Sequence, residues 1–310
     1  MSQLNKLSVS GLFHLCIVYI LWGSTYLAIR VAVQDGSGFP PMIMSATRVF
    51  AGSLILMALA KFIYKQSLRL TYDEFVVLFI SGLALWWGGN GLLAIAETTV
   101  SSGYAALIIS CTPIWVALIE SILDKKRPTF FLVGSLLVSI AGISVLNWPA
   151  IHAGNLSDLW GALLLIIAGL SWAAGSIYQK RKNVQSSPEV SSAFQQLFGG
   201  IALLITSFII SEPAINPISS AWWAWGYLIV FGSVIAFTSF VKALKLLPPN
   251  VVFTYAFINP VVAVLLGFLI LKEPITQWTL SGAFLVIIGV LGIFKEQKTK
   301  LNYVKENDID

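Results

Sequence analysis

Residues 101–146 read SSGYAALIISCTPIWVALIESILDKKRPTFFLVGSLLVSIAGISVL. Two apolar runs, residues 101–123 and 130–146, lie on either side of the basic triplet Lys125, Lys126 and Arg127. About 20 apolar residues in an α-helix span the ~30 Å hydrocarbon core of a bilayer. This stretch therefore predicts two membrane-spanning helices that are joined by a short cationic turn.

The rest of the chain repeats this pattern of apolar runs and short polar connections. Of its 310 residues, 57% are hydrophobic and only 11% are charged, whereas soluble domains carry roughly 25% charged residues. The other apolar runs cover residues 11–33, 41–60, 75–95, 159–178, 191–210, 222–242, 251–271 and 278–294. Backbone groups in lipid must bond internally, and the alternation typical of a membrane barrel is absent. The sequence predicts an all-α membrane protein with ten transmembrane helices.

The basic residues favour one side of the predicted membrane. If the N-terminus is cytoplasmic, 16 of the 19 Lys and Arg residues fall on the cytoplasmic side, Lys272 falls outside, and Arg30 and Arg48 lie within spans. Cytoplasmic loops of membrane proteins are enriched in Lys and Arg. We therefore expect both termini in the cytoplasm, and we attribute the net charge of +5 to this bias rather than to nucleic-acid binding.

Patterns for cofactors and catalysis are missing from the sequence. Cys16 and Cys111 lie inside apolar runs, and His14 and His152 have no partners at metal-ligand spacing. The glycines at 88–91 lie within a predicted helix, which is the wrong context for a phosphate-binding loop. The first apolar run exceeds 20 residues, which favours a first span over a cleaved signal peptide. We expect no cofactor, no metal site and no enzymatic activity.

The two halves of the chain share short sequences in the same order. The matching segments are residues 22–26 with 172–176, residues 47–52 with 195–200, and residues 112–113 with 259–260. Because each half has five predicted helices, the second half would enter the membrane in the opposite sense. Inverted repeats of this kind place a solute site between them, near the midplane. We expect repeats at 11–147 and 159–294, followed by a cytoplasmic tail at 295–310.

Several of these segments resemble the EamA family of the drug/metabolite transporter superfamily. The strongest are LWGSTYLAIR at 21–30, TRVF at 47–50 and YAFINPVVAVLLG at 255–267, followed by Glu273-Pro274. The resemblance covers about residues 11–294. It implies two five-helix repeats, the inner membrane of a bacterial cell, and export of metabolites, amino acids or drugs. The implied partners are a small solute and the lipid bilayer.

Arg48 is the most informative single residue. It lies about seven residues into the second predicted span, roughly 10 Å below the outer surface at 1.5 Å per residue. A cation at that depth costs several kcal/mol unless it is paired or hydrated. It either binds an anionic group of the solute or is structural, bonding helix-end carbonyls or Glu97.

We expect a central cavity between the first, third, fourth, sixth, eighth and ninth helices. Arg48 would set its polarity, and deeply placed aromatic side chains would set its shape. The candidate lining residues are Trp22, Ser24, Thr25, Tyr26, Arg48, Trp86, Trp87, Asn90, Tyr104, Trp172, Ser176, Tyr255 and Asn259. One deep cation with amides and aromatic rings favours a zwitterionic metabolite over a polyanion.

Three further residues are candidates for moving parts and for ion coupling. Pro113 and Pro260 lie inside the fourth and ninth predicted spans, where proline removes a backbone N–H and frees a carbonyl one turn earlier. They are either hinges or static kinks. Glu97 lies near the outer end of the third span, where it either couples protons to transport or is an ordinary interfacial carboxylate.

The predicted function is therefore secondary transport that exports small metabolites, such as amino acids, by alternating access. One alternative is a proton-coupled multidrug efflux carrier. An alternative from another class is a membrane-embedded lipid-modifying enzyme, which would need paired carboxylates, a His cluster or a nucleophile–base pair near one interface. The oligomeric state stays open between monomer and homodimer.

Overall fold

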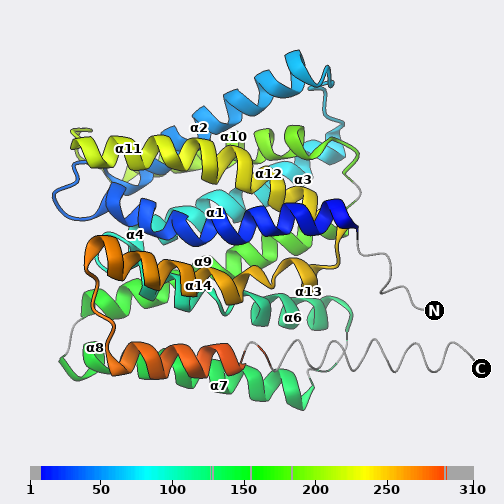
Figure 1. The fold of residues 1–310 in the computed structure, drawn as a ribbon. Helices are drawn as coiled ribbons and strands as arrows, with labels where there is room; N and C mark the ends of the chain where they lie inside the picture. Colours follow the sequence, from blue (N-terminus) through cyan, green and yellow to red (C-terminus); the bar gives the residue numbers. More distant parts are fainter. Residues whose placement is uncertain are drawn as a thin grey trace, which may run out of the picture.

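A computed structural model describes residues 8–125, 127, 129–153, 156–182, 184–289 and 291. Its described residues are helical and contain no strand, and the helices lie side by side along a common direction (Figure 1). The predicted tail at 295–310 lies outside the described residues. The all-helical fold class is confirmed.

The described residues fold into α-helices and short π-helical segments, most of them joined by short connections. The helices and π-helical segments (η) are α1 (Val9–Val33), α2 (Pro41–Ala58), η2 (Leu59–Ile63), α3 (Tyr72–Gly82), η3 (Leu83–Gly91), α4 (Leu92–Ala96), α5 (Ser102–Ile109), α6 (Thr112–Leu123), α7 (Phe130–Leu146), α8 (Trp148–Ala153), α9 (Leu156–Arg181), α10 (Pro188–Ile209), α11 (Ser219–Tyr227), η4 (Leu228–Ala236), α12 (Phe237–Leu246), α13 (Pro249–Val252), α14 (Tyr255–Leu266) and η5 (Gly267–Leu271). A further apolar helix covers Gln277–Gly289.

Seven helices are long and apolar enough to cross a membrane. They are Val9–Val33, Pro41–Ile63, Tyr72–Ala96, Ser102–Leu123, Leu156–Arg181, Pro188–Ile209 and Ser219–Leu246. Three shorter apolar helices lie at Phe130–Leu146, Ile258–Leu271 and Gln277–Gly289. Multiple membrane spans are thus confirmed, and the count of ten stays a prediction.

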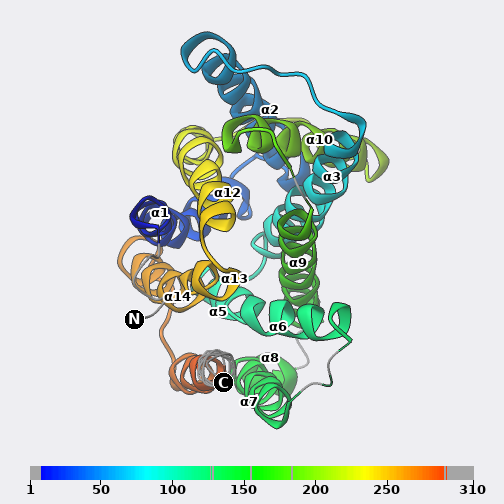
Figure 2. The same ribbon diagram turned by 90° about the vertical axis from the view of Figure 1, so that its right-hand side faces the viewer.

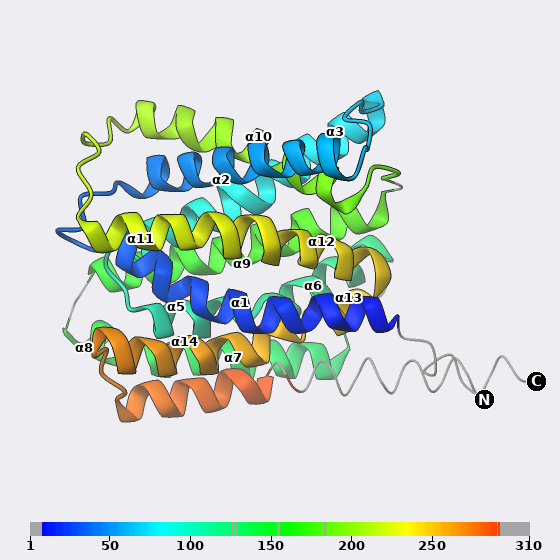
Figure 3. The same cartoon turned by 45° about the horizontal axis from the view of Figure 1, so that its top comes forward.

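The two halves of the chain are interleaved rather than segregated. Seen along the helix axes, α1, α12, α3, α9, α5 and α14 surround a common centre (Figure 2). The helices α2 and α10, one from each half, pack along one another beside this ring (Figure 3). The central region is therefore built from both halves of the chain.

α7 and the helix Gln277–Gly289 form a separate pair at one side of the ring (Figure 2). Their backbones approach closely at Gly142 and Gly282, where a Cβ on Gly142 would lie 2.8 Å from the Val286 nitrogen. Small residues allow such close helix crossings in membranes. Glycine therefore allows this close crossing, and apolar side chains of both helices, Leu132 and Val286, belong to one buried cluster beside it.

Two of the predicted spans are broken rather than continuous. The run at 101–123 is interrupted at Ser110 and Cys111, between α5 and α6, and the run at 251–271 is interrupted at Phe253 and Thr254, between α13 and α14. Pro113 lies in the first turn of α6, and Pro260 lies inside α14. Pro113 is thus not inside a continuous helix, because proline at a helix start lacks only an N–H that has no partner there.

π-helical turns occupy equivalent places in both halves. η3 and η4 each have nine residues and lie in the middle of the third and eighth predicted spans. π-turns are rare and occur frequently at functional sites. The sequence pattern did not indicate them, because π and α segments share nearly the same apolar periodicity.

Candidate solute-binding site

A cavity with about 550 Å³ of empty space lies in the middle of the helix ring. Its walls come from α1, α2, η3, α4, α5, α9 and α14. The lining residues are Trp22, Thr25, Tyr26, Ile29, Arg48, Trp86, Gly89, Asn90, Leu93, Ile109, Ala168, Trp172 and Tyr255. Aromatic and apolar side chains with a few convergent polar groups are typical of sites that bind small organic molecules.

Eight residues predicted from the sequence line the cavity. They are Trp22, Thr25, Tyr26, Arg48, Trp86, Asn90, Trp172 and Tyr255. The aliphatic and small residues of the wall were not predicted, because they carry no distinguishing chemistry. The prediction also named the eighth span in place of the second: η4 contributes only through Ser233, whose hydroxyl binds Arg48.

Trp87 and Ser24 lie outside the lining. The Trp87 side chain turns outward and is 44% exposed, and its Nε1 donates to Thr206 Oγ1 at 2.8 Å. Ser24 Oγ lies 2.6 Å from Tyr227 Oη. Each of these residues is next in the chain to a lining residue, Trp86 or Thr25, and the rotation of about 100° per residue along a helix directs its side chain away from the cavity.

Tyr104, Ser176 and Asn259 are also absent from the lining. Tyr104 Oη donates to Asn147 Oδ1 near the end of α7. Ser176 Oγ donates back to the Trp172 carbonyl at 2.8 Å. The Asn259 amide, oriented to donate, lies 3.3 Å from backbone carbonyls in α1 and α14. These three side chains bond to the protein itself, so their placement indicates a structural use.

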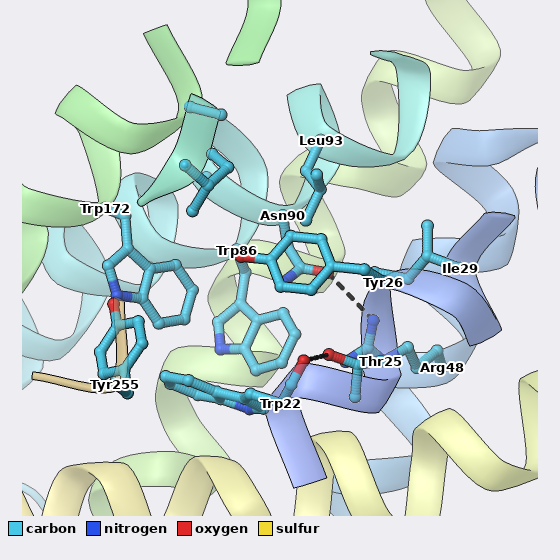
Figure 4. A pocket seen from close by; sticks show the side chains of 13 residues that line it. Trp22, Thr25, Tyr26, Ile29, Arg48, Trp86, Asn90, Leu93, Trp172 and Tyr255 are labelled. Atoms are coloured by element: carbon cyan, nitrogen blue, oxygen red, sulfur yellow. Dashed lines mark hydrogen bonds between the residues drawn. The ribbon is translucent and has the colours of Figure 1, made fainter. Parts of the chain in front are cut away.

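Arg48 is 2% exposed and faces the cavity. Its Nε donates to Ser233 Oγ at 2.9 Å, and its Nη1 donates to Asn90 Oδ1 at 3.0 Å (Figure 4). Its Cζ lies 5.4 Å from the centre of the Trp86 ring. These partners are neutral, and the described residues place no carboxylate in an ion pair with Arg48. Its positive charge is therefore not neutralised.

The structural role considered for Arg48 is carried out by another arginine. Arg30 Nη1 donates to the backbone carbonyl of Glu97, whereas Arg48 bonds neither a helix-end carbonyl nor the Glu97 carboxyl in the described structure. A buried cation without an anionic partner is costly. Arg48 thus lies at the cavity wall with only neutral hydrogen-bond partners, Ser233 and Asn90.

Aromatic rings form the opposite side of the cavity. The Trp22 ring lies 5.3 Å from Trp172 and 5.3 Å from Tyr255, both nearly perpendicular to it. Figure 4 shows these rings at one end of the cavity and Arg48 with Asn90 at the other. Such edge-to-face rings offer a large apolar surface. The cavity therefore has one polar end and one aromatic end.

The two broken helices end at this cavity. Ile109 is the last residue of α5 and Tyr255 is the first residue of the 12-residue α14, and both line the wall. A helix N-terminus carries a partial positive charge that favours anions. Discontinuous helices that meet a central site are a recurring feature of secondary transporters. The wall thus includes the C-terminal end of α5 and the N-terminal end of α14, whose partial charges are opposite in sign.

Glu97 follows α4 and is 0% exposed. Neither of its carboxyl oxygens has a hydrogen-bond partner among the described residues. The charged groups that act on it are Glu273, Arg30 and Arg48. A buried carboxylate without a partner is strongly disfavoured as an anion, so the neutral acid fits this arrangement.

The sequence and its relatives identify the family. Residues 9–148 and residues 159–295 each match the EamA-like transporter family. The chain belongs to this family. Its own apolar helices and this membership make it a membrane transporter.

The described residues contain no group of three or more His, Cys, Asp or Glu side chains that could hold a metal ion.

Named relatives and a solved structure agree with this assignment. The chain is 34% identical to "Uncharacterized inner membrane transporter YedA" of Escherichia coli (strain K12), over 89% of each chain. It is 24% identical to "Uncharacterized transporter YoaV" of Bacillus subtilis (strain 168), over 88% of this chain and 92% of the relative. A structure described as "Crystal structure of protein" has the same fold, with a TM-score of 0.66 at 20% identity, over 91% and 96% of the two chains.

Proposed function

We propose that this transporter exports small amphipathic solutes that carry a carboxylate, such as amino acids or aromatic acids, by alternating access. The observation that carries the proposal is Arg48, a buried cation with only neutral partners, at the polar end of a cavity whose other end is aromatic. The carboxylate would bind Arg48 in a charge-assisted pair. The aromatic end would bind the solute's apolar body.

The proposed direction of transport depends on which end of the protein faces the cytoplasm, and the distribution of Lys and Arg residues indicates that end. In Figure 1 the starts of α1, α3 and α10 lie at one end of the molecule, and the loops between spans at that end carry the excess of Lys and Arg. This end would face the cytoplasm. The relative in Escherichia coli is named an inner membrane transporter, which supports the same membrane here.

The interleaved halves support alternating access as the mechanism. Two inverted five-helix repeats would rock about the cavity that they share. The breaks before α6 and before α14 would let those helices bend, and so would Pro113 in the first turn of α6 and Pro260 inside α14. η3 carries Trp86 and Asn90, so movement of this π segment would reshape the polar end of the cavity directly.

Counterflow in proteoliposomes tests this function. Liposomes that hold purified protein are preloaded with unlabelled solute, and uptake of labelled amino acids and aromatic acids is followed. We expect uptake that needs preloading and is lost in Arg48→Ala, while the variant elutes as folded protein. Preloading-dependent uptake that Arg48→Ala leaves unchanged would exclude Arg48 as the solute-binding group.

Proton-coupled efflux is a second candidate, favoured by Glu97. Its buried carboxyl has no partner among the described residues, so a change that exposes it to the outer side would release a proton. If Glu97 couples transport, an imposed pH gradient drives uptake by the wild type and has no effect on Glu97→Gln. Wild-type uptake at the same rate with and without the pH gradient would exclude this coupling.

A further inference from the structure

A second cavity, with about 540 Å³ of empty space, lies at the end of the molecule that faces the viewer in Figure 2. Its walls come from the last turns of α9 and α12, the first residues of α10 and the segment between α9 and α10. Three lysines line it: Lys180, Lys182 and Lys245. No Asp or Glu is among its lining residues in the described structure.

Two of the three lysines are bonded to backbone carbonyls, and the third, Lys182, has its Nζ 5.9 Å from the centre of the Tyr178 ring. Lys180 Nζ donates to the carbonyls of Leu244 at 2.6 Å and Leu247 at 3.2 Å, and Lys245 Nζ lies 3.4 Å from the Ser186 carbonyl. Within the described part of the chain none of them forms an ion pair. Carbonyl oxygens fix an ammonium group but do not cancel its charge. Glu74, which is not in the wall, accepts hydrogen bonds from the N–H and the hydroxyl of the lining residue Ser186 at 2.7 Å, so three lysines face one adjacent carboxylate and the cavity keeps an excess of positive charge.

One further feature of the wall suits a bound solute. Gln179 is 8% exposed, lines the cavity, and has a side-chain Oε1 with no hydrogen-bond partner among the described residues. The helix α10 begins at Pro188, also in the wall, but Ser187 caps it and Glu189 lies in its first turn, so this helix start offers no free site for an anion. The free amide oxygen of Gln179 can accept a hydrogen bond from an ammonium group, and the lysines can bind a carboxylate. The wall thus offers contacts for both ends of a zwitterion.

This lysine cavity is aligned with the central cavity. Gln179 lies seven residues after Trp172 on α9, which puts it on the same helix face about 10 Å further along. Leu244 bears the same relation to Phe237 on α12. A layer of aromatic rings separates the two cavities, with Trp172 5.5 Å from Phe240. A solute that crossed this layer would pass from one cavity into the other.

We propose that the lysine cavity is a second solute site, where a small organic anion binds at the cytoplasmic end before the aromatic layer admits it to the central cavity. The identity of this anion as the transported solute rests on the proposed function, but the anion preference of the cavity does not. The cytoplasmic bias of basic residues accounts for lysines at this end, and it does not account for their convergence on one cavity.

Thiol labelling tests the anion preference without any transport step. Val184 lines the cavity and is replaced by cysteine in a background in which Cys16 and Cys111 are alanine. The labelling rate is compared for a sulfonate-bearing and an ammonium-bearing methanethiosulfonate. We expect the Lys182→Gln/Lys245→Gln pair to lower the sulfonate-to-ammonium rate ratio at least about fivefold, because the loss of two cations slows the anionic reagent and speeds the cationic one. An unchanged ratio would overturn the proposal.

The matched control is Lys61→Gln, which removes an exposed lysine at the same end of the molecule and away from the cavity. We expect it to leave the rate ratio unchanged. Millimolar phenylacetate should slow labelling by the sulfonate reagent, and phenylacetamide should not. Equal effects of the acid and the amide would exclude a carboxylate site.

Liposome composition distinguishes a solute site from a lipid site. Labelling that slows in phosphatidylglycerol compared with phosphatidylcholine liposomes, with no effect of phenylacetate, would assign the cavity to a lipid headgroup and overturn the solute proposal. The labelling rates do not depend on Arg48. If Arg48→Ala leaves counterflow unchanged, the proposed function fails. The labelling ratios then still decide whether the lysine cavity binds anions.

Discussion

At the scale of single residues, Arg48 could be singled out from the sequence and its partners could not. Its depth in an apolar run indicated a function or a buried partner, because an unpaired cation is costly in a membrane. Ser233 binds it from 185 residues away, and no local pattern links these two positions. Asn90 was predicted as a lining residue, but its bond to Arg48 also required the fold.

The two side chains that hold Arg48 give the first prediction. We expect Ser233→Ala and Asn90→Ala each to raise the KM for a carboxylate solute about tenfold, because a hydrogen bond to a charged group contributes about 1.5–3 kcal/mol. Counterflow at a series of solute concentrations measures this change.

Ser24→Ala is the matched control for these variants, because its hydroxyl bonds Tyr227 outside the cavity. It should keep the wild-type KM. If Ser24→Ala raised the KM by the same factor, the effect would follow from the loss of any buried hydroxyl in this helix bundle. The result would then not support the view that Ser233 and Asn90 orient Arg48.

At the scale of elements, apolar runs predict where helices lie but not where they break. The sequence placed the second span at residues 41–60, and α2 with η2 extends from Pro41 to Ile63. The breaks at 110–111 and 253–254 fall inside long apolar runs, at or beside Ser110, Thr112 and Thr254. At these breaks local hydroxyls donate to carbonyls one turn earlier: Thr112 Oγ1 to the Ile109 carbonyl and Thr254 Oγ1 to the Val251 carbonyl. Ser and Thr make the same bonds inside continuous helices, so their presence in the sequence does not indicate a break.

The broken helices give the second prediction, which concerns Pro113 and Pro260. Replacing both by alanine restores two backbone donors and favours straight, continuous helices. If bending is part of transport, we expect turnover to fall about tenfold, a barrier increase of about 1.4 kcal/mol, with an unchanged KM. Counterflow rates measure both quantities. Pro149→Ala, in the short helix α8, is the control, and wild-type turnover in the double variant would exclude the hinge.

The close crossing of α7 with Gln277–Gly289 gives the third prediction. In Gly142→Leu the new side chain would meet the Val286 nitrogen and the Gly282 carbonyl, at 2.8 and 3.0 Å from its Cβ. Overpacking of this kind costs about 1–3 kcal/mol, so the thermal unfolding midpoint in detergent should fall. Gly134→Leu on the same helix, where a Cβ meets nothing within 4 Å, should unfold at the wild-type temperature. Equal midpoints for the two variants would contradict the crossing.

At the scale of the whole molecule, composition was enough for the class of protein, and matching segments were enough for the family. The apolar fraction excluded a soluble fold, and the segments around Trp22 and Asn259-Pro260 carried the family resemblance that the matches at 9–148 and 159–295 bear out. The cavity could be predicted only in part. Aromatic and charged residues stand out in a sequence, but whether Trp86 or Trp87 faces inward depends on helix rotation, which packing decides.

The central claim is that Arg48 selects solutes by their carboxylate, and paired inhibitors test it most directly. Counterflow of a labelled solute is measured with increasing unlabelled phenylacetate or phenylacetamide, in wild type and in Arg48→Gln. We predict that the acid competes at least about tenfold better than the amide in the wild type, and that Arg48→Gln loses this preference while residual uptake persists. An acid preference of the same size in Arg48→Gln would contradict the account.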